Sequence, residues 1–149
     1  MAILTAKLKL QLNDSRGFTL SEILAVTGIF GILAVIAVPQ FSALQPSLRL
    51  NGAARQVFSE IMSARMKAVN ENTTYTVTFP NDHSIQIAGS TTRTVDIQAL
   101  YSGVTLSSSA SSISLSSRGT ADVSSTITIT NTSGSKTVSV KITGAATIS

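Results

Sequence analysis

The sequence has 149 residues, of which 43% are hydrophobic and 12% charged, and it contains no cysteine. This length supports one modest hydrophobic core, and the missing thiols exclude disulfides, cysteine nucleophiles and thiolate metal sites. The formal net charge is +4, but Lys7, Lys9 and Arg16 lie within the first 17 residues against one acid, so the remainder carries only +2. A charge this small does not by itself indicate a nucleic-acid partner.

The first predicted element is an apolar segment over residues 20–38, in which only Ser21, Glu22 and Thr27 are polar. As a helix rising ~1.5 Å per residue, it would extend ~28 Å, about the hydrocarbon thickness of a bilayer. The cations that precede it predict a cytoplasmic N-terminal side by the positive-inside rule. We therefore expect the chain after Pro39 to lie outside the cytoplasm.

Two ordinary interpretations of this segment leave Glu22 unexplained. A secretory signal peptide could be cleaved near Ala34 to Ala37, but its apolar core is normally only ~7–15 residues long and gains nothing from a carboxylate. A plain single-span anchor fits the length, yet an ionisable group inside a span is costly. A local explanation is a capping box, because Thr19 and Glu22 have the Thr-x-x-Glu spacing at a helix start.

The residues from Arg16 to Glu22, with the sequence RGFTLSE, and the apolar run that reaches Pro39 resemble the class III signal of type IV pilins and type II secretion pseudopilins. In that family a prepilin peptidase cuts after the glycine, on the cytoplasmic face, and N-methylates the new terminal residue. The resemblance implies cleavage between Gly17 and Phe18 and methylation of Phe18. It also implies a leader over residues 1–17, a transmembrane or filament-core helix over 18–40, and a globular head over 41–149.

The same resemblance gives Glu22 a role in assembly. Cleavage would create an ammonium group at Phe18, and a subunit that joins a filament must bring this cation into a dry bundle of helices. Opposite charges ~4 Å apart attract by ~4 kcal/mol at an effective dielectric near 20, whereas an unpaired charge costs several kcal/mol in desolvation. We therefore expect Glu22 to neutralise the Phe18 amine of a neighbouring subunit and so to set the register between subunits.

Beyond the span, an apolar stripe with steps of four and three residues predicts an amphipathic helix. The stripe consists of Leu50, Ala54, Val57, Ile61, Ala64 and Ala68, with Arg55, Glu60, Arg65 and Lys67 largely off it. Pro39, Pro46 and the pair Asn51-Gly52 predict interruptions of the helix between span and stripe, either as bends or as a locally melted segment. In the pilin family, loosening of this part of the helix accompanies filament packing, which implies helix melting between Gly31 and Pro39.

After Asn70 the apolar period changes from 3.6 to 2, which predicts strands. The expected strands cover residues 74–79, 84–87, 92–97, 112–115, 126–130, 136–142 and 145–148. Pro80-Asn81-Asp82 and residues 131–135 are expected turns, and residues 107–112 an expected mobile loop. A helix that covers the apolar face of antiparallel strands gives an α+β fold, a long N-terminal helix on antiparallel β-sheets.

The head resembles the GspH/FimT group, which contains the H-type pseudopilins of type II secretion and FimT-like minor pilins. The resemblance rests on residues 65–69 leading into 75–79, on residues 117–121, and on Gly144. It implies a low-abundance subunit that helps to initiate or cap a filament. Its implied partners are other pilins or pseudopilins, the prepilin peptidase and the assembly platform of the bacterial inner membrane, with the head in the periplasm before assembly.

Alternative functions receive less support from the residues. FimT-like DNA-uptake pilins have a basic C-terminal segment, but residues 144–147 here contain no arginine, so DNA binding is not expected. The remaining cations of the sheet region are scattered, as on a solvated surface, and comprise Arg93, Arg118, Lys136 and Lys141. A major pilin remains an alternative, although the cysteines of a C-terminal disulfide loop are absent, and an anchored adhesin is disfavoured by the leader.

Nothing in the sequence indicates an enzyme. The single histidine, His83, is expected on a surface turn beside Asp82, and one histidine among many serines is no specific sign of a catalytic triad. Asp82, Asp96 and Asp122 lie in separate segments without the spacing of a calcium loop, so neither a metal nor a cofactor is expected.

Overall fold

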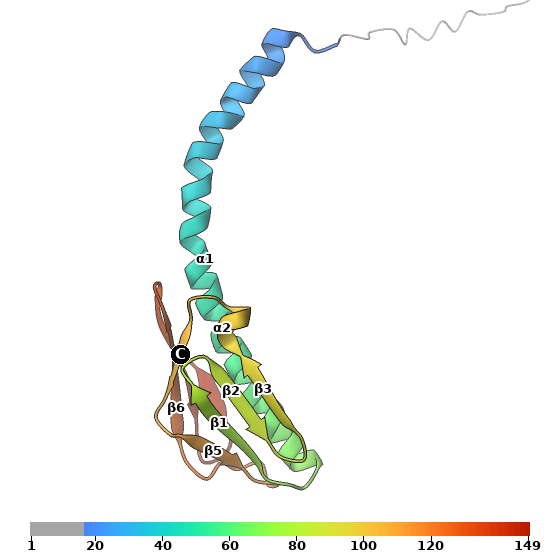
Figure 1. Ribbon diagram of the computed structural model, residues 1–149, viewed down its shortest axis with the longest axis vertical. Coiled ribbons are helices and arrows are strands. Elements are labelled where there is room, and N and C mark those ends of the chain that lie inside the picture. The colour runs from blue at the N-terminus through green and yellow to red at the C-terminus, as the bar shows by residue number, and fades with distance from the viewer. Residues whose placement is uncertain (1–16) are drawn as a thin grey trace, which may run out of the picture. The chain divides into compact units, whose positions relative to one another are not determined.

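The computed structural model describes residues 17–149, so all of the predicted leader except Gly17 falls outside the described residues. The chain divides into two units, Met1–Gln40 and Phe41–Ser149. One helix, α1 (Leu20–Asn70), contributes to both. Its first part belongs to the N-terminal unit, and its second part packs within the head (Figure 1).

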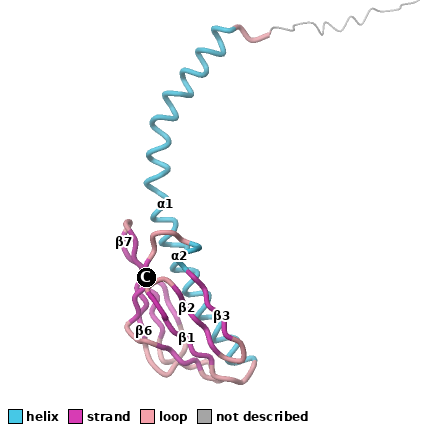
Figure 2. Tube along the Cα trace, viewed as in Figure 1, coloured by secondary structure: helices cyan, strands magenta, loops and turns pink. Residues whose placement is uncertain are grey.

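Helix α1 is continuous through Pro39, Pro46 and Asn51-Gly52, so of the two expected outcomes, a bend or a locally melted segment, the melted segment was wrong for the chain described here (Figure 2). Each proline removes only one helical hydrogen bond, whereas melting the segment would give up several. Close to Pro46, the Asn131 side chain donates a 2.6 Å hydrogen bond to the Pro46 carbonyl. Gly52 is required for packing, because a Cβ there would collide with the ring of Tyr101.

The head contains two four-stranded antiparallel sheets. In spatial order, the first comprises β3 (Thr92–Asp96), β2 (Ser84–Ala88), β1 (Tyr75–Asn81) and β5 (Ser112–Leu115). The second comprises β4 (Thr105–Ser108), β6 (Ser125–Asn131), β7 (Gly134–Val140) and β8 (Ala146–Ile148). The long helix packed on antiparallel sheets confirms the predicted α+β fold.

Two elements of the head were not predicted. A short helix, α2 (Ile97–Leu100), follows β3 and begins at Asp96, whose side chain accepts a hydrogen bond from the Ala99 amide. Strand β4 occupies part of the segment expected to be a mobile loop. The pattern of β4 is weak because only Leu106 of this strand is apolar, and its pairing with β6 supplies the order that its own sequence does not.

The hydrophobic core lies between α1 and the two sheets. The whole predicted stripe of α1 is buried, which confirms it: Leu50, Ala54, Val57, Ile61, Ala64 and Ala68. These side chains form one cluster with residues of both sheets, including Val77, Ile85 and Ile127. Glu60, which was expected off the stripe, is also buried, so that part of the prediction was wrong.

Candidate functional site

The start of α1 has the geometry of the predicted capping box. The Thr19 hydroxyl accepts a 3.2 Å hydrogen bond from the Glu22 amide, and a Glu22 carboxylate oxygen accepts a 3.5 Å bond from the Thr19 amide. Gly17 and Phe18 precede the helix and are exposed. The capping box is thus confirmed, and the two residues on either side of the expected cleavage point lie outside regular structure, where a protease can reach the backbone.

Phe18 and Glu22 face an open hollow at the helix start. The hollow measures about 300 Å³ and is lined by Phe18, Glu22, Ile23, Val26 and Thr27. Within one chain the Glu22 carboxylate caps its own helix by accepting the hydrogen bond from the Thr19 amide. Because both Phe18 and Glu22 are exposed, each is free to meet a group from another molecule.

The rest of the N-terminal part of α1 is an uncovered apolar surface. Its large hydrophobic side chains from Leu20 to Val38 are between 47% and 80% exposed. Soluble monomers rarely leave contiguous apolar patches of more than a few hundred Å² in water. Among the described residues, α1 is the one helix long and apolar enough to cross a membrane. Lipid or other helices must therefore cover this surface.

Gly28 and Gly31 lie within this apolar surface. A Cβ placed on either glycine would meet no atom within 4 Å, so neither glycine is needed for contacts inside the chain. Small residues on a membrane helix allow a neighbouring helix to approach closely. The interval from Gly31 to Pro39 is helical here, and its melting during filament packing stays a prediction.

In the head, the segments that carried the family resemblance converge on Arg65. The Arg65 Nε donates a 2.8 Å hydrogen bond to the Gly119 carbonyl, and another guanidinium nitrogen lies 3.4 Å from the Thr143 carbonyl. Gly119 and Gly144 both have positive φ angles, 76° and 75°. A Cβ on Gly144 would collide with the Gly119 carbonyl oxygen. These two glycines therefore let the loops that contain Gly119 and Gly144 approach each other closely, and Arg65 connects both loops to α1 by hydrogen bonds.

The sequence did not indicate this function of Arg65, because its partners are backbone carbonyls 54 and 78 residues away. The two glycines were the available signal, since an isolated glycine often marks a close approach of two backbones. Sequence alone could not say which side chain would bind there.

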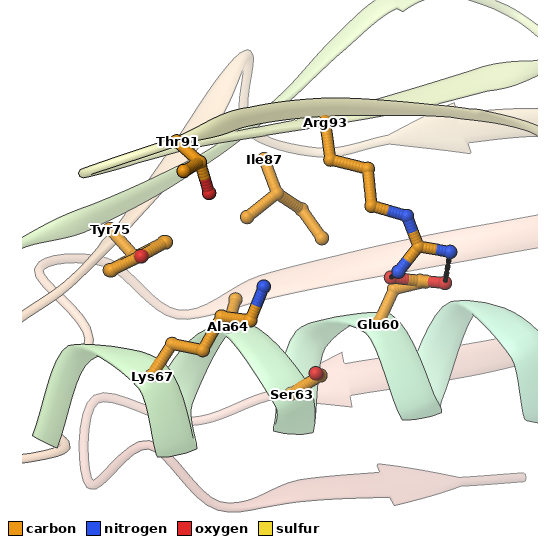
Figure 3. Close-up of a pocket in the computed structure, with 8 residues that line it drawn as sticks. All are labelled: Glu60, Ser63, Ala64, Lys67, Tyr75, Ile87, Thr91 and Arg93. Atoms are coloured by element: carbon orange, nitrogen blue, oxygen red, sulfur yellow. Dashed lines mark hydrogen bonds and ion pairs between the residues drawn. The ribbon is translucent and has the colours of Figure 1, made fainter. Parts of the chain in front are cut away.

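Glu60 and Arg93 form an ion pair at the edge between α1 and β3 (Figure 3). The Arg93 guanidinium lies 3.3 Å from each carboxylate oxygen of Glu60, and the Gln56 amide donates a 2.8 Å bond to the same carboxylate. The Glu60 side chain is only 5% exposed, against 59% for Arg93. Arg93 is thus largely exposed, as expected of a surface cation, but it also compensates the buried charge of Glu60, which the sequence did not indicate.

Glu71 closes the C-terminal end of α1. Its carboxylate accepts hydrogen bonds from Ser90 Oγ and, at 2.7 Å, from Tyr75 Oη. These bonds, first the one from Ser90 and then the one from Tyr75, hold the pKa of Glu71 below its ordinary value, and Lys67 acts in the same direction. The network ties the helix end to β1 and to the loop between β2 and β3.

The histidine and the aspartates of residues 17–149 make local contacts in separate parts of the head. His83 Nδ1 lies 2.6 Å from Asp82 Oδ1 on a surface turn, as the sequence predicted. No group of three His, Cys, Asp or Glu side chains in this part of the chain could hold a metal ion. Asp96 instead caps α2, and Asp122 accepts a 2.8 Å hydrogen bond from the Ser114 amide at the edge of β5.

Comparisons with known proteins agree with this geometry. The family model described as "Type II transport protein GspH" matches residues 53–145, and the model described as "Prokaryotic N-terminal methylation motif" matches residues 12–38. No curated protein was found to match the sequence.

Two crystal structures of the type IV minor pilin FimU from Pseudomonas aeruginosa are similar in fold. The form in space group P65 has 17% sequence identity and a TM-score of 0.57, over 67% of this chain and 92% of the FimU chain. The form in space group P21 has 16% identity and a TM-score of 0.59, over 71% and 92% of the two chains. At these identities the likeness is one of fold.

The GspH model spans more than half of the chain, and the methylation motif covers the start of the helix that precedes it. Members of this family are structural pilin subunits and not enzymes. The chain belongs to the GspH family and is a minor pilin or pseudopilin, with an apolar helix suited to membrane anchoring.

Proposed function

We propose that this protein is a single-pass subunit of the bacterial inner membrane whose head lies in the periplasm until the subunit is drawn into a type IV pilus or a type II secretion pseudopilus. The observation that carries the proposal is the uncovered apolar part of α1, with one carboxylate at its start and the N-terminal methylation motif over it. The positive leader supports the orientation.

The first step is processing by a prepilin peptidase. Residues 1–17 act as the leader, cleavage falls between Gly17 and Phe18, and Phe18 becomes the methylated terminus. The exposed, non-helical backbone at these two residues supports this site. The anchor then comprises residues 18–40 and the head residues 41–149, a division that resembles the two units of the chain.

The second step is lateral association in the membrane. The apolar surface of α1 exchanges lipid for the helices of neighbouring pilins, and the new Phe18 amine of one subunit approaches Glu22 of the next. Desolvation makes an unpaired charge costly there, so the pair favours one axial register over others. The inner-membrane assembly platform supplies the force that moves the subunit from the bilayer into the filament.

The third step is a change in α1 itself. Pro39 lacks the amide that the helix would otherwise use, and Gly31 has a low helix propensity, so the interval between them is a part of the span that melts at low cost. Stretching this interval would let the head and the anchor adopt positions that a rigid helix forbids. The continuous helix described here is then the membrane state.

Intact-mass measurement of the protein extracted from the membranes of its native host tests the processing step. We expect a mass that lacks residues 1–17 and carries one additional methyl group. A Gly17→Val variant should retain the leader, because the peptidase of this family cuts after glycine. Wild-type protein that keeps Met1 to Gly17, or that has been cut near Ala37, would contradict the proposed function.

A further inference from the structure

A groove lies beside the Arg65 contacts, at the C-terminal end of α1. It measures about 200 Å³ and is lined by Arg65, Met66, Val69, Asn70, Arg118 and Gly119. All of its lining residues belong to the head. Neither the membrane segment nor the Phe18–Glu22 pair takes part in it.

The apolar side chains of this groove are unusually exposed for the packed part of α1. Met66 is 60% exposed and Val69 47%, while Ala64 and Ala68 on the neighbouring face are fully buried. A flexible methionine next to a branched side chain offers an apolar surface that can adapt to a partner. Removing these apolar side chains from water is favourable, so a partner that covers them gains binding free energy.

The groove is also positively charged and contains no carboxylate among its lining residues. Arg65 donates its hydrogen bonds to the neutral carbonyls of Gly119 and Thr143, so no negative charge neutralises its guanidinium group. Within residues 17–149, Arg118 is exposed and takes part in no hydrogen bond or ion pair. Two guanidinium groups therefore flank two apolar side chains.

We propose that this groove is a docking site for the head of another filament subunit, which presents a carboxylate next to an apolar side chain. The proposal rests on the proposed function and names the chemistry of one head-to-head contact. The apolar lining favours a protein segment over a phosphate backbone, which would use the cations but would leave Met66 and Val69 in water. A guanidinium also binds a carboxylate through two parallel hydrogen bonds.

Methionine-methyl NMR on the full chain in detergent micelles tests the proposal. The chain has only three methionines, so a sample labelled at the methionine methyl groups reports on Met66 separately from Met62 and Met1. The probe is a blocked peptide with one aspartate between two leucines. Two comparison peptides replace the aspartate by asparagine or both leucines by serine.

We expect the aspartate–leucine peptide to shift the Met66 signal in a saturable manner and to leave Met62 unchanged. The asparagine peptide should bind about threefold more weakly, as the loss of an exposed ion pair allows. The serine peptide should bind at least as weakly, because it cannot cover Met66 and Val69. Arg118→Gln should weaken binding of the charged peptide to the same extent. Arg55→Gln, an exposed arginine on the same helix outside the groove, should leave binding unchanged.

Equal binding of the charged and neutral peptides, or equal effects of the two arginine substitutions, would overturn the proposal. So would a short DNA duplex that shifts Met66 when the peptides do not. None of these results depends on cleavage of the leader or on Glu22. Failure here would therefore leave the function in filament assembly standing, whereas failure of the mass measurement would remove the filament subunit as the partner without changing the peptide result, so the two failures can be told apart.

Discussion

The two parts of α1 show how one continuous helix can be built for two solvents. Up to residue 45 every described residue is exposed, and the apolar side chains there surround the helix on all sides. From Leu50 onward most apolar side chains occupy one stripe, which is buried against the sheets, and only Met66 and Val69 are exposed large apolar side chains. A helix that is apolar all round needs lipid or other helices, whereas a striped helix needs one partner surface. The apolar surface of the first part is uncovered within one chain, whereas the stripe of the second part is covered by the sheets of the same chain.

The largest expected effect concerns the exposed N-terminal part of α1. Glu22→Ala should leave membrane insertion intact but reduce incorporation into filaments by about tenfold or more, because the Phe18 amine of the neighbouring subunit would be buried without a counter-charge. The measurement is the ratio of this subunit in sheared filaments to that in membranes of the native host. Glu22→Gln should fail similarly, since it restores shape but not charge.

The matched control is Thr27→Ala, which removes a polar group of the same span. The Thr27 hydroxyl only bonds the Ile23 carbonyl of its own helix, at 2.8 Å. Incorporation should therefore stay close to wild type. If Glu22→Ala enters filaments as readily as Thr27→Ala, the charge-pair role of Glu22 is wrong.

An isoleucine-to-alanine pair tests the contrast between the two parts directly. Ile61→Ala should lower the free energy of unfolding of the head by about 2–5 kcal/mol, because Ile61 is fully buried in the core. Ile32→Ala should change it by about 0.5 kcal/mol or less, as for an exposed site. Denaturation in detergent micelles can be followed by tyrosine fluorescence, since both tyrosines, Tyr75 and Tyr101, lie in the head. Equal losses would contradict the separation.

A glycine pair tests how the head holds α1 at Arg65. Gly103 and Gly144 have similar positive φ angles, 80° and 75°, so Ala costs about 1–2 kcal/mol of backbone strain at either position. At Gly103 the added methyl group meets open space, but at Gly144 it meets the Gly119 carbonyl, which adds about 1–3 kcal/mol. The difference in unfolding free energy between the two variants measures the close approach of the two loops, and its absence would disprove that approach.

The smallest expected effect is a pH dependence at the end of α1. The folded-state pKa of Glu71 lies below its ordinary value of 4.5, because Ser90 and Tyr75 donate to the ionised carboxylate. The stability that this network contributes is therefore full above pH 4.5 and is lost as the pH falls through the lowered pKa. Glu71→Gln removes the charge that these bonds stabilise, so it should lower the stability slightly at neutral pH, leave it close to wild type at the lowest pH, and flatten the pH dependence of unfolding in this acid range. If the variant loses stability with falling pH as steeply as the wild type, other carboxylates cause that loss.

The strength of the pattern in each segment decided how much of the fold could be predicted. The stripe from Leu50 to Ala68 and the alternation in β6 and β7 could be read directly, because each repeats over several turns or residues. β4 could not be predicted, since one apolar residue gives no period. The locally melted alternative at the prolines was wrong, because the cost of one missing amide does not outweigh the helical hydrogen bonds around it.

For the candidate site the division is equally clear. Residues 17–22, their capping box and the apolar run are local in the chain, so the sequence alone determined where the apolar helix starts and which polar groups lie at its start. The Arg65 contacts with Gly119 and Thr143, the Glu60–Arg93 pair and the groove beside Arg118 join residues that are distant in sequence. Only the tertiary structure decided these, because a side chain's partner depends on which backbone the packed sheets bring within hydrogen-bonding distance.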